Sequence, residues 1–347
     1  MSGKRQHYVP RFLQSGFASH ANGNEMFTWV HRKGAKSFNT NIINAGVEGH
    51  FYSQDGDSQL DDEITAAEAQ FGGLIDALRN GTENSTANSE SLAELVAHLE
   101  VRTRHLRQSF ATTAGVVVEE LLRFVEDEQA FGGYLRRRIK NDPSFMRDAI
   151  AEELRKRGLP DALLPHLLVA SQPLLEQMLS SLLADLPSIA SHFRTALPQM
   201  LKTASKSGHI KALRQSLAPQ VKTDQYRNLR FHLARSTEAV LPLGDSMLVF
   251  QLNGERPFKP FFEKDDPLQA VYLPLSPSLV LIGSVDDNTP DLAQVPLAIA
   301  QCSLEYFISH SRSDTIDDLH THIGEFAHLL SEDQIDAVIT EVMNEQA

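Results

Sequence analysis

Near the start of the chain, two short segments have the pattern of apolar and polar positions that is typical of β-strands. Residues 26–31 alternate, with Phe27 and Trp29 on one face, which predicts a β-strand. The turn at 32–36 contains a glycine, and residues 37–43 form a second strand-like segment, which together predict a hairpin. We therefore expect residues 1–58 to hold a terminal motif followed by a small β-hairpin.

The pattern changes to helical spacing at Leu60. From there to Arg79, apolar residues recur every three or four positions, which predicts a helix. Ser91 and Glu94 form a capping box, which predicts the start of a second helix. Helical spacing continues beyond it, with breaks where proline and glycine occur, so residues 59–217 are predicted to be a helical region.

Beyond residue 226 the apolar runs become short and are separated by Gly, Pro and Asp. They predict strands at 230–233, 238–242, 247–252, 270–273 and 279–285. Helical spacing returns at 296–309, 317–330 and 332–344. Because strands and helices are segregated along the chain, we predict an α+β fold rather than alternating βαβ units. Its parts are an N-terminal hairpin, a mostly helical middle, a small antiparallel sheet and C-terminal helices, in one compact domain over residues 1–347.

Composition indicates the class of protein and the compartment in which we expect it. The chain has 347 residues, of which 41% are hydrophobic, so a packed core is expected. Cys302 is the only cysteine, which excludes an internal disulfide. The N-terminus lacks an apolar signal region, and no apolar run approaches the roughly 18–20 residues of a membrane span. We therefore expect a cytoplasmic protein with no membrane partner.

Charge is distributed unevenly. The formal net charge is −13, which argues against a protein surface that binds nucleic acids non-specifically. The segment from Lys202 to Arg235, however, holds eight Lys and Arg residues and one acid, Asp224. It is either neutralised by acidic parts of the same fold or forms a footprint for phosphate groups, which would allow a nucleic-acid partner.

Several polar residues are candidates for chemistry. On the helix after the capping box, Glu94, His98, Arg102 and His105 are spaced by four, four and three, which predicts one polar stripe. Such a stripe is a boundary ion-pair ladder, an anion site or, less commonly, a zinc site. His7 lies among basic residues, which favour an anion beside its ring.

The acidic candidates also have a structural and a functional interpretation. Glu63 and Glu68 are five residues apart and do not share one helix face, and an acid near a helix start usually compensates the helix dipole. Asp245 follows Gly244 in a predicted turn between apolar strands, where an acid is structural or lines a site.

The opening residues His7-Tyr8-Val9-Pro10-Arg11-Phe12-Leu13, with Gly16-Phe17, resemble the start of a mostly bacterial family, domain of unknown function 4238. Weaker similarities follow in the family's order at Phe51-Tyr52-Ser53, Glu63 and Glu68, Arg102-Thr103, Gly244-Asp245-Ser246 and Pro274-Leu275-Ser276-Pro277. Met247 stands where proline is usual. The resemblance implies one compact unit from about His7 onward and raises the weight on His7, Glu63, Arg102 and Asp245 as one clustered site. It implies no activity.

Three functional hypotheses remain open. The first is a bacterial hydrolase of phosphodiester bonds, nuclease-like and related to defence or toxin action. In it His7 is a general base or metal ligand, Glu63 and Asp245 are metal ligands or proton acceptors, and Arg102 clamps a phosphate. A divalent metal is compatible with this set.

The hydrolase hypothesis adds Arg11, Tyr52, His98 and His105 as substrate-binding residues. It predicts that His7→Ala and Arg102→Ala abolish activity with stability changes within about 1 kcal/mol. The second hypothesis is a non-catalytic module that binds a small anionic ligand or a protein partner. The third is a buried hydrogen-bonded network that specifies the fold.

Overall fold

The computed structural model describes residues 5–53, 59–81, 89–141, 143–171, 175–236, 240–254, 256–286, 292–328, 334–337 and 340. By its contacts the chain divides into two compact units. Unit 1 comprises residues 1–111 and 204–329, and unit 2 comprises residues 112–203 and 330–347. Helices α4 (Arg104–Glu126) and α8 (Leu175–Gln215) run through both units. The predicted helical region at 59–217 therefore does not coincide with either unit.

Unit 1 contains the predicted hairpin. Strands β3 (Glu25–Arg32) and β4 (Phe38–Asn41) pair antiparallel, and β2 (His20–Asn22) pairs with the start of β3. The edge of β3 opposite to β4 also pairs with β12 (Tyr306–Ser309), which in turn pairs with β7 (Leu243–Gly244). The hairpin prediction is confirmed, but the partner strand comes from the far end of the chain.

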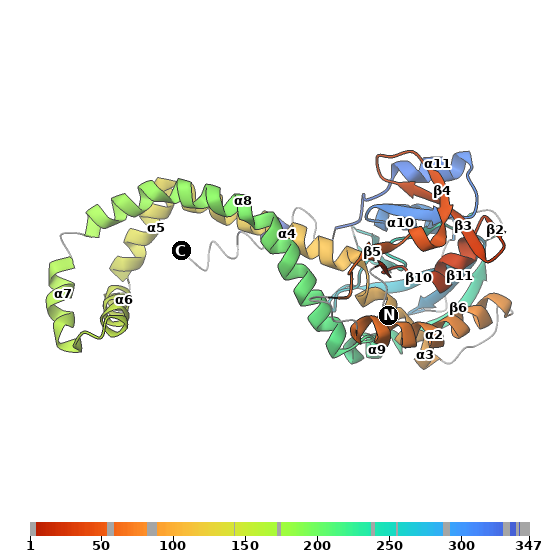
Figure 1. The fold of residues 1–347 in the computed structure, drawn as a ribbon, viewed down its shortest axis with the longest axis horizontal. Helices are drawn as coiled ribbons and strands as arrows, with labels where there is room; N and C mark the ends of the chain where they lie inside the picture. The colour runs from red at the N-terminus through yellow and green to blue at the C-terminus, as the bar shows by residue number, and fades with distance from the viewer. Residues whose placement is uncertain are drawn as a thin grey trace. The chain divides into compact units, whose positions relative to one another are not determined.

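A second antiparallel sheet forms the centre of unit 1. Its order is β6–β11–β10–β8–β9, with bounds Arg230–Arg235, Leu279–Ser284, Leu268–Ser276, Val249–Leu252 and Phe258–Lys259. Alternate residues of β10 enter two different cores, Val271 and Leu273 on one face and Ala270 and Tyr272 on the other. Helices α2 (Gln59–Asn80), α3 (Ser89–Val101) and α9 (Gln220–Tyr226) contribute to the first core, and α10 (Val295–Cys302) to the second (Figure 1).

Helices segregated on an antiparallel sheet confirm the α+β class. The predicted helix at 296–309 is wrong in its second half, because α10 ends at Cys302 and Tyr306–Ser309 is strand β12. Helix α11 (Asp314–Thr321) follows, with Ser313 as its N-cap. The predicted helix at 332–344 lies largely outside the described residues. Within the described residues, no helix is long and apolar enough to cross a membrane.

The opening motif is anchored by packing and by main-chain contacts. Strand β1 (Arg5–His7) pairs with β5 (Val47–Gly49), and the short helix α1 (Arg11–Gln14) follows Pro10. The Arg79 guanidinium donates to the carbonyl oxygens of Phe12, Leu13 and Leu275 at 2.8–3.0 Å. A Cβ atom on Gly16 would collide with the Leu275 carbonyl and with Arg79, so this position requires glycine. The motif thus fixes the chain terminus against α2 and the central sheet.

Unit 2 is helical in its described residues. It holds the second part of α4, the helices α5 (Glu128–Asn141), α6 (Pro143–Lys156) and α7 (Leu164–Ser171), and the first part of α8. Arg194 of α8 joins the helices by donating to both Glu119 and Glu126 of α4 at 2.6–3.0 Å.

Candidate functional site

A buried arginine organises the candidate site. Arg102 follows the last residue of α3 and is 1% exposed. Its Nε donates to the Tyr52 hydroxyl at 3.0 Å, and one terminal nitrogen donates to His98 Nε2 at 3.1 Å. The other terminal nitrogen donates to the His7 carbonyl oxygen at 2.8 Å and lies 2.6 Å from a carboxylate oxygen of Glu68.

These contacts leave Arg102 little capacity for a ligand. A guanidinium has five N–H donors, and a bidentate clamp needs two adjacent ones. Adjacent donors lie on Nε and Nη2 or on Nη1 and Nη2, so Nη2 takes part in either clamp. Both N–H groups of Nη2 are used, one by His7 and one by Glu68. The predicted role of Arg102 as a phosphate clamp would therefore require displacement of Glu68.

His98 is locked in one tautomer. Its Nδ1 lies 3.1 Å from the Leu217 carbonyl oxygen, which can only accept, so Nδ1 carries the proton and Nε2 accepts from Arg102. Burial, and then the charge of Arg102, lowers the pKa of His98 to about 3. The predicted neighbourhood of His98 and Arg102 is confirmed by this contact, and the ring is neutral at physiological pH.

His7 meets Arg102 through its main chain, whereas the hydrolase hypothesis needs its ring. The ring is half-buried, and its Nδ1 atom is buried without a hydrogen-bond partner. Burial and then Arg11 lower the pKa of His7 to about 4. The side chain of Arg11 itself is exposed at the start of α1.

The structure selects Glu68 rather than Glu63 as the acid beside Arg102. The Glu68 side chain is 24% exposed and forms the solvent-facing member of the cluster. Glu63 is exposed and accepts from Gln59 on its own helix at 2.9 Å. Both belong to α2, but the phase of that helix against α3 brings only Glu68 to the guanidinium.

Replacing Glu68 tests this selection. We expect Glu68→Ala to lower the free energy of unfolding by about 1–3 kcal/mol, because the buried cation of Arg102 loses its counter-charge. Glu63→Ala, a matched change on the same helix, should stay within about 0.5 kcal/mol. Urea unfolding at pH 7 measures both. Equal effects of the two variants would contradict the pairing.

Asp245 lies in a different setting. Its carboxylate accepts from the main-chain N–H groups of Leu304, Glu305 and Tyr306 at 2.7, 2.8 and 3.3 Å. Burial raises its pKa to about 6, against the effect of these N–H donors. It thus holds the chain between α10 and β12 and makes no described contact with Arg102. Met247 in the same turn has φ +63°, which a proline cannot adopt.

His105 also lies away from the predicted stripe. Helix α3 ends at Val101 and α4 begins at Arg104, so His98 and His105 are not on one continuous helix. His105 Nε2 donates to the Ala327 carbonyl oxygen, and burial lowers the pKa of the ring to about 3. The stripe prediction was wrong at this point because the helix is interrupted two residues before His105.

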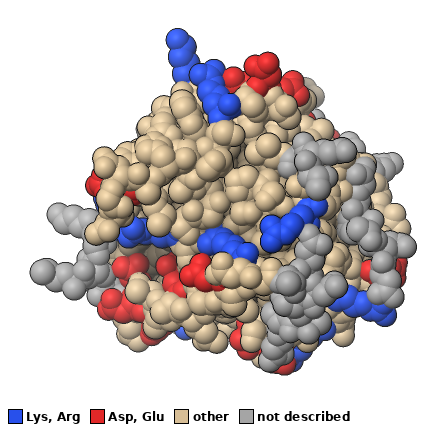
Figure 2. Space-filling view, turned by 90° about the vertical axis from the view of Figure 1, so that its right-hand side faces the viewer, with Lys and Arg blue, Asp and Glu red and all other residues tan. Residues whose placement is uncertain are grey.

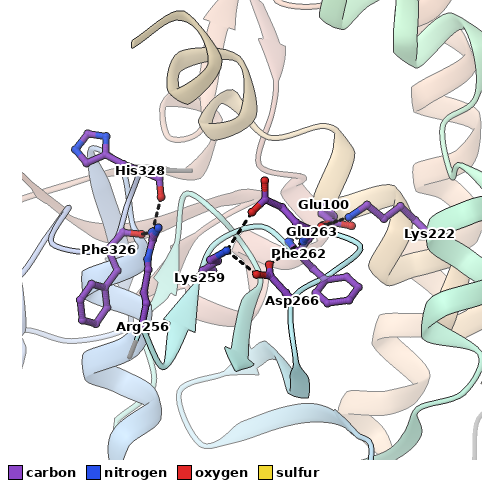
Figure 3. Close-up of polar contacts among 9 residues, drawn as sticks. All are labelled: Glu100, Lys222, Arg256, Lys259, Phe262, Glu263, Asp266, Phe326 and His328. Carbon is purple, nitrogen blue, oxygen red and sulfur yellow. Dashed lines mark hydrogen bonds and ion pairs between the residues drawn. The ribbon is translucent and has the colours of Figure 1, made fainter. Parts of the chain in front are cut away.

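A second buried charge was not anticipated from the sequence. Glu100 is 1% exposed and accepts from Lys222 Nζ and the Phe262 N–H, each at 2.9 Å (Figure 3). It also accepts from the Tyr226 hydroxyl at 2.6 Å. Burial raises the pKa of Glu100, and Lys222 opposes this effect. Lys222 and Tyr226 are four residues apart on α9 and share one helix face. This spacing was the feature of the sequence that could have indicated a shared partner.

The basic segment at 202–235 is partly neutralised within the fold. Lys222 is paired with Glu100, and Arg227 is paired with Glu90 and Asp224. On the face of the molecule shown in Figure 2, the Lys and Arg side chains are scattered and interspersed with Asp and Glu. Nucleic-acid binding by this segment stays a prediction.

A metal site has no ready ligand set here. In the described part of the chain, no group of three or more His, Cys, Asp or Glu side chains is arranged to hold a metal ion. The geometry that is present is a neutral histidine, a paired arginine and a tyrosine, which together form a saturated hydrogen-bonded network rather than an open set of reactive groups.

Comparison with known proteins gives one match. No curated protein and no solved structure is significantly similar to this chain. The resemblance seen at the opening motif extends over nearly the whole chain. Residues 5–328 match the family described as protein of unknown function (DUF4238), and the chain belongs to that family.

Proposed function

We propose that this protein is a non-catalytic binding module that docks on a protein partner through α8 in unit 2. The observation that carries the proposal is an exposed apolar face on that helix. Met178, Leu182, Ile189, Phe193 and Met200 are between 37% and 60% exposed. At 100° per residue they fall within a stripe about 60° wide.

Charge is nearly absent along the same stretch. From 177 to 201 the only charged residues are Asp185 and Arg194, whereas 22% of the whole chain is charged. Arg194 is engaged with α4, so Asp185 is the only charge left for the outward faces. Interfaces between proteins are depleted of charge and enriched in Met and aromatic residues, which this stripe matches.

The saturated cluster around Arg102 supports the same proposal. Its donors are occupied by the chain itself, and its histidine is neutral. In this proposal the cluster has a supporting role: it holds α2, α3 and the opening motif together, and the docking surface lies on the other unit.

Site-specific photo-crosslinking in cells tests the proposal. A photoreactive amino acid at Phe193 should give a discrete crosslinked polypeptide, whereas the same amino acid at Ser191 should not. Ser191 is exposed and lies about 160° around the helix from Phe193, so it is a matched control. Equal crosslinking from the two positions, or none from Phe193, would overturn the proposal.

Phosphodiester hydrolysis is the second candidate, favoured by one observation. The buried Nδ1 of His7 lacks a partner, and the exposed Arg11 lies close enough to affect the ring. The candidate requires that the protein cleave DNA or RNA, with and without added divalent metal, and that His7→Ala abolish cleavage while the fold is retained. Absence of cleavage across a nuclease panel would remove it.

A further inference from the structure

The apolar stripe on α8 has a symmetric arrangement along the helix. Ile189 is its centre. On one side Asp185, Leu182 and Met178 follow at steps of four, three and four residues, and on the other side Phe193, Ala196 and Met200 follow at the same steps. Spacing of this kind keeps all seven positions on one helix face. The spacing of the stripe is therefore the same in both directions from Ile189, although the residue types differ.

We propose that the occupant of this stripe is a second copy of the same chain, packed antiparallel with Ile189 on the twofold axis. This inference rests on the proposed function and names its partner. A twofold interface uses the same patch on both subunits, so the patch must be complementary to itself. A stripe whose spacing is symmetric about one residue is compatible with this condition.

The side chains complement one another across the proposed axis. With Ile189 facing Ile189, Met178 of one copy lies opposite Met200 of the other, and Leu182 lies opposite Ala196. The second pair places a large side chain against a small one, which lets two helices approach closely. The stripe from Met178 to Met200 is about 33 Å long at 1.5 Å per residue.

The one charge at the stripe also finds a partner. Asp185 and His192 lie at the same edge of the stripe, separated by about 20° around the helix axis. In an antiparallel pair each edge meets the same edge of the other copy. Asp185 is four residues from the axis and His192 three, so Asp185 of one copy lies within about 1.5 Å in height of His192 of the other. His192 Nδ1 already donates to the Ser188 carbonyl oxygen at 2.7 Å, which leaves Nε2 for this contact.

Other features of α8 are consistent with this use. Pro187 and Pro198 lie on the side opposite to the stripe, so neither ring interrupts it. The side next to the stripe packs within unit 2: Leu179, Leu183 and Leu197 are buried there. The apolar surface of α8 is therefore wider than packing within the described part of unit 2 requires.

Sedimentation of the purified full chain tests the second copy. Between about 1 and 200 µM the protein should pass from monomer to dimer. Ile189→Lys should weaken the dimer at least about thirty-fold, because it places two cations at the centre of the contact. Ser191→Lys, a matched exposed change on the opposite side of the helix, should leave the equilibrium unchanged. A protein that is monomeric throughout this range would overturn the inference.

Disulfide trapping tests the direction of packing. Helix axes 8–10 Å apart place facing Cα atoms about 4–5 Å apart, within disulfide range. The native Cys302 is buried and will not interfere. Oxidised Ile189→Cys should give a covalent dimer. Met178→Cys alone should not, but a mixture of Met178→Cys with Met200→Cys should. A covalent dimer from Met178→Cys alone would indicate parallel packing and overturn the antiparallel arrangement.

The remaining outcomes separate this inference from the proposed function. A monomer whose Phe193 position still crosslinks to a different polypeptide would overturn the second copy and leave the docking function standing. A monomer that binds vesicles of phosphatidylcholine and phosphatidylglycerol, and loses binding with Ile189→Lys, would overturn both. A monomer in which Ile189→Cys reacts with maleimide only after removal of residues 329–347 would assign the stripe to the chain's own C-terminal segment and also overturn both.

Discussion

Replacing Arg102 with alanine should lower the free energy of unfolding by about 4 kcal/mol, because it removes one partner of a buried ion pair and of three further hydrogen bonds. The change leaves the Tyr52 hydroxyl and His98 Nε2 without the donor that satisfies them, and the His7 carbonyl keeps only the Tyr52 hydroxyl at 3.3 Å. A buried acceptor without a partner costs about 1–3 kcal/mol. Urea unfolding at pH 7 measures the loss.

Two further variants make the Arg102 result specific. Arg102→Lys keeps the charge but not the planar fork, so it should recover the contact with Glu68 and remain less stable than the native protein by about 2 kcal/mol. Arg5→Ala removes an exposed arginine that donates to Asn44 in the same region, and should stay within about 0.5 kcal/mol.

The expected loss also separates the interpretations of the cluster. The hydrolase hypothesis required Arg102 to be dispensable for stability, within about 1 kcal/mol. An Arg102→Ala protein as stable as the native one would contradict the supporting role and restore a catalytic role to consideration.

Contacts at helical spacing could be predicted from the sequence. His98 and Arg102 are four residues apart, and side chains at this spacing meet on a helix surface whatever the rest of the chain does. The hairpin of β3 and β4 is local for the same reason. The apolar run around β10 and β11 was also informative, because a strand with both faces buried has few polar positions.

Contacts between elements could not be predicted in the same way. Glu63 and Glu68 are equally plausible partners for an arginine until the rotation of α2 against α3 is known. The break after Val101 has no glycine or proline to announce it, so His105 was placed on the wrong face. Asp245 caps a segment about sixty residues away, and nothing near it in the sequence names that segment.

The opening motif shows how a distinctive sequence can be structural. Its glycine is required by the close approach of Leu275 and Arg79, and its buried side chains enter the main core. Arg79 binds the carbonyl oxygens that follow the motif. Close packing accounts for Gly16, and burial in the core accounts for Leu13 and Phe17. The exposed Arg11 makes no described contact with the core.

Mild acid should destabilise unit 1 steeply, because five of its histidines have a lowered pKa and four of these rings are buried. His98 and His209 have the same arrangement: one ring nitrogen donates to a carbonyl oxygen, and the other accepts from an arginine, Arg102 or Arg107. Burial, and then the neighbouring arginine, lowers the pKa of His98 to about 3 and that of His209 to about 4. Burial lowers the pKa of His105 to about 3 and that of His31 to about 4, and burial and then Arg11 lower the pKa of His7 to about 4.

The sign follows from these pKa values. Each ring has a lower pKa in the folded state than the 6.5 of an unfolded histidine, so below pH 6.5 the unfolded chain binds more protons and stability falls with pH. Five such rings give a slope approaching about 7 kcal/mol per pH unit. Asp245 acts in the opposite direction, because its raised pKa of about 6 lets the folded state take up a proton first.

We therefore expect the free energy of unfolding to fall by about 6–7 kcal/mol between pH 6.5 and pH 5, a large part of the 5–15 kcal/mol typical of a folded protein. Urea unfolding at half-unit pH steps measures the curve. His209→Gln keeps a donor and an acceptor but cannot titrate, so it should reduce the slope by about one fifth. Replacing the exposed His166 on α7 with asparagine should leave the curve unchanged, since no buried ring is removed. A curve that is flat from pH 7 to pH 5 would show that these rings accept protons without unfolding, and that the Arg102 and Arg107 contacts are weaker than their geometry indicates.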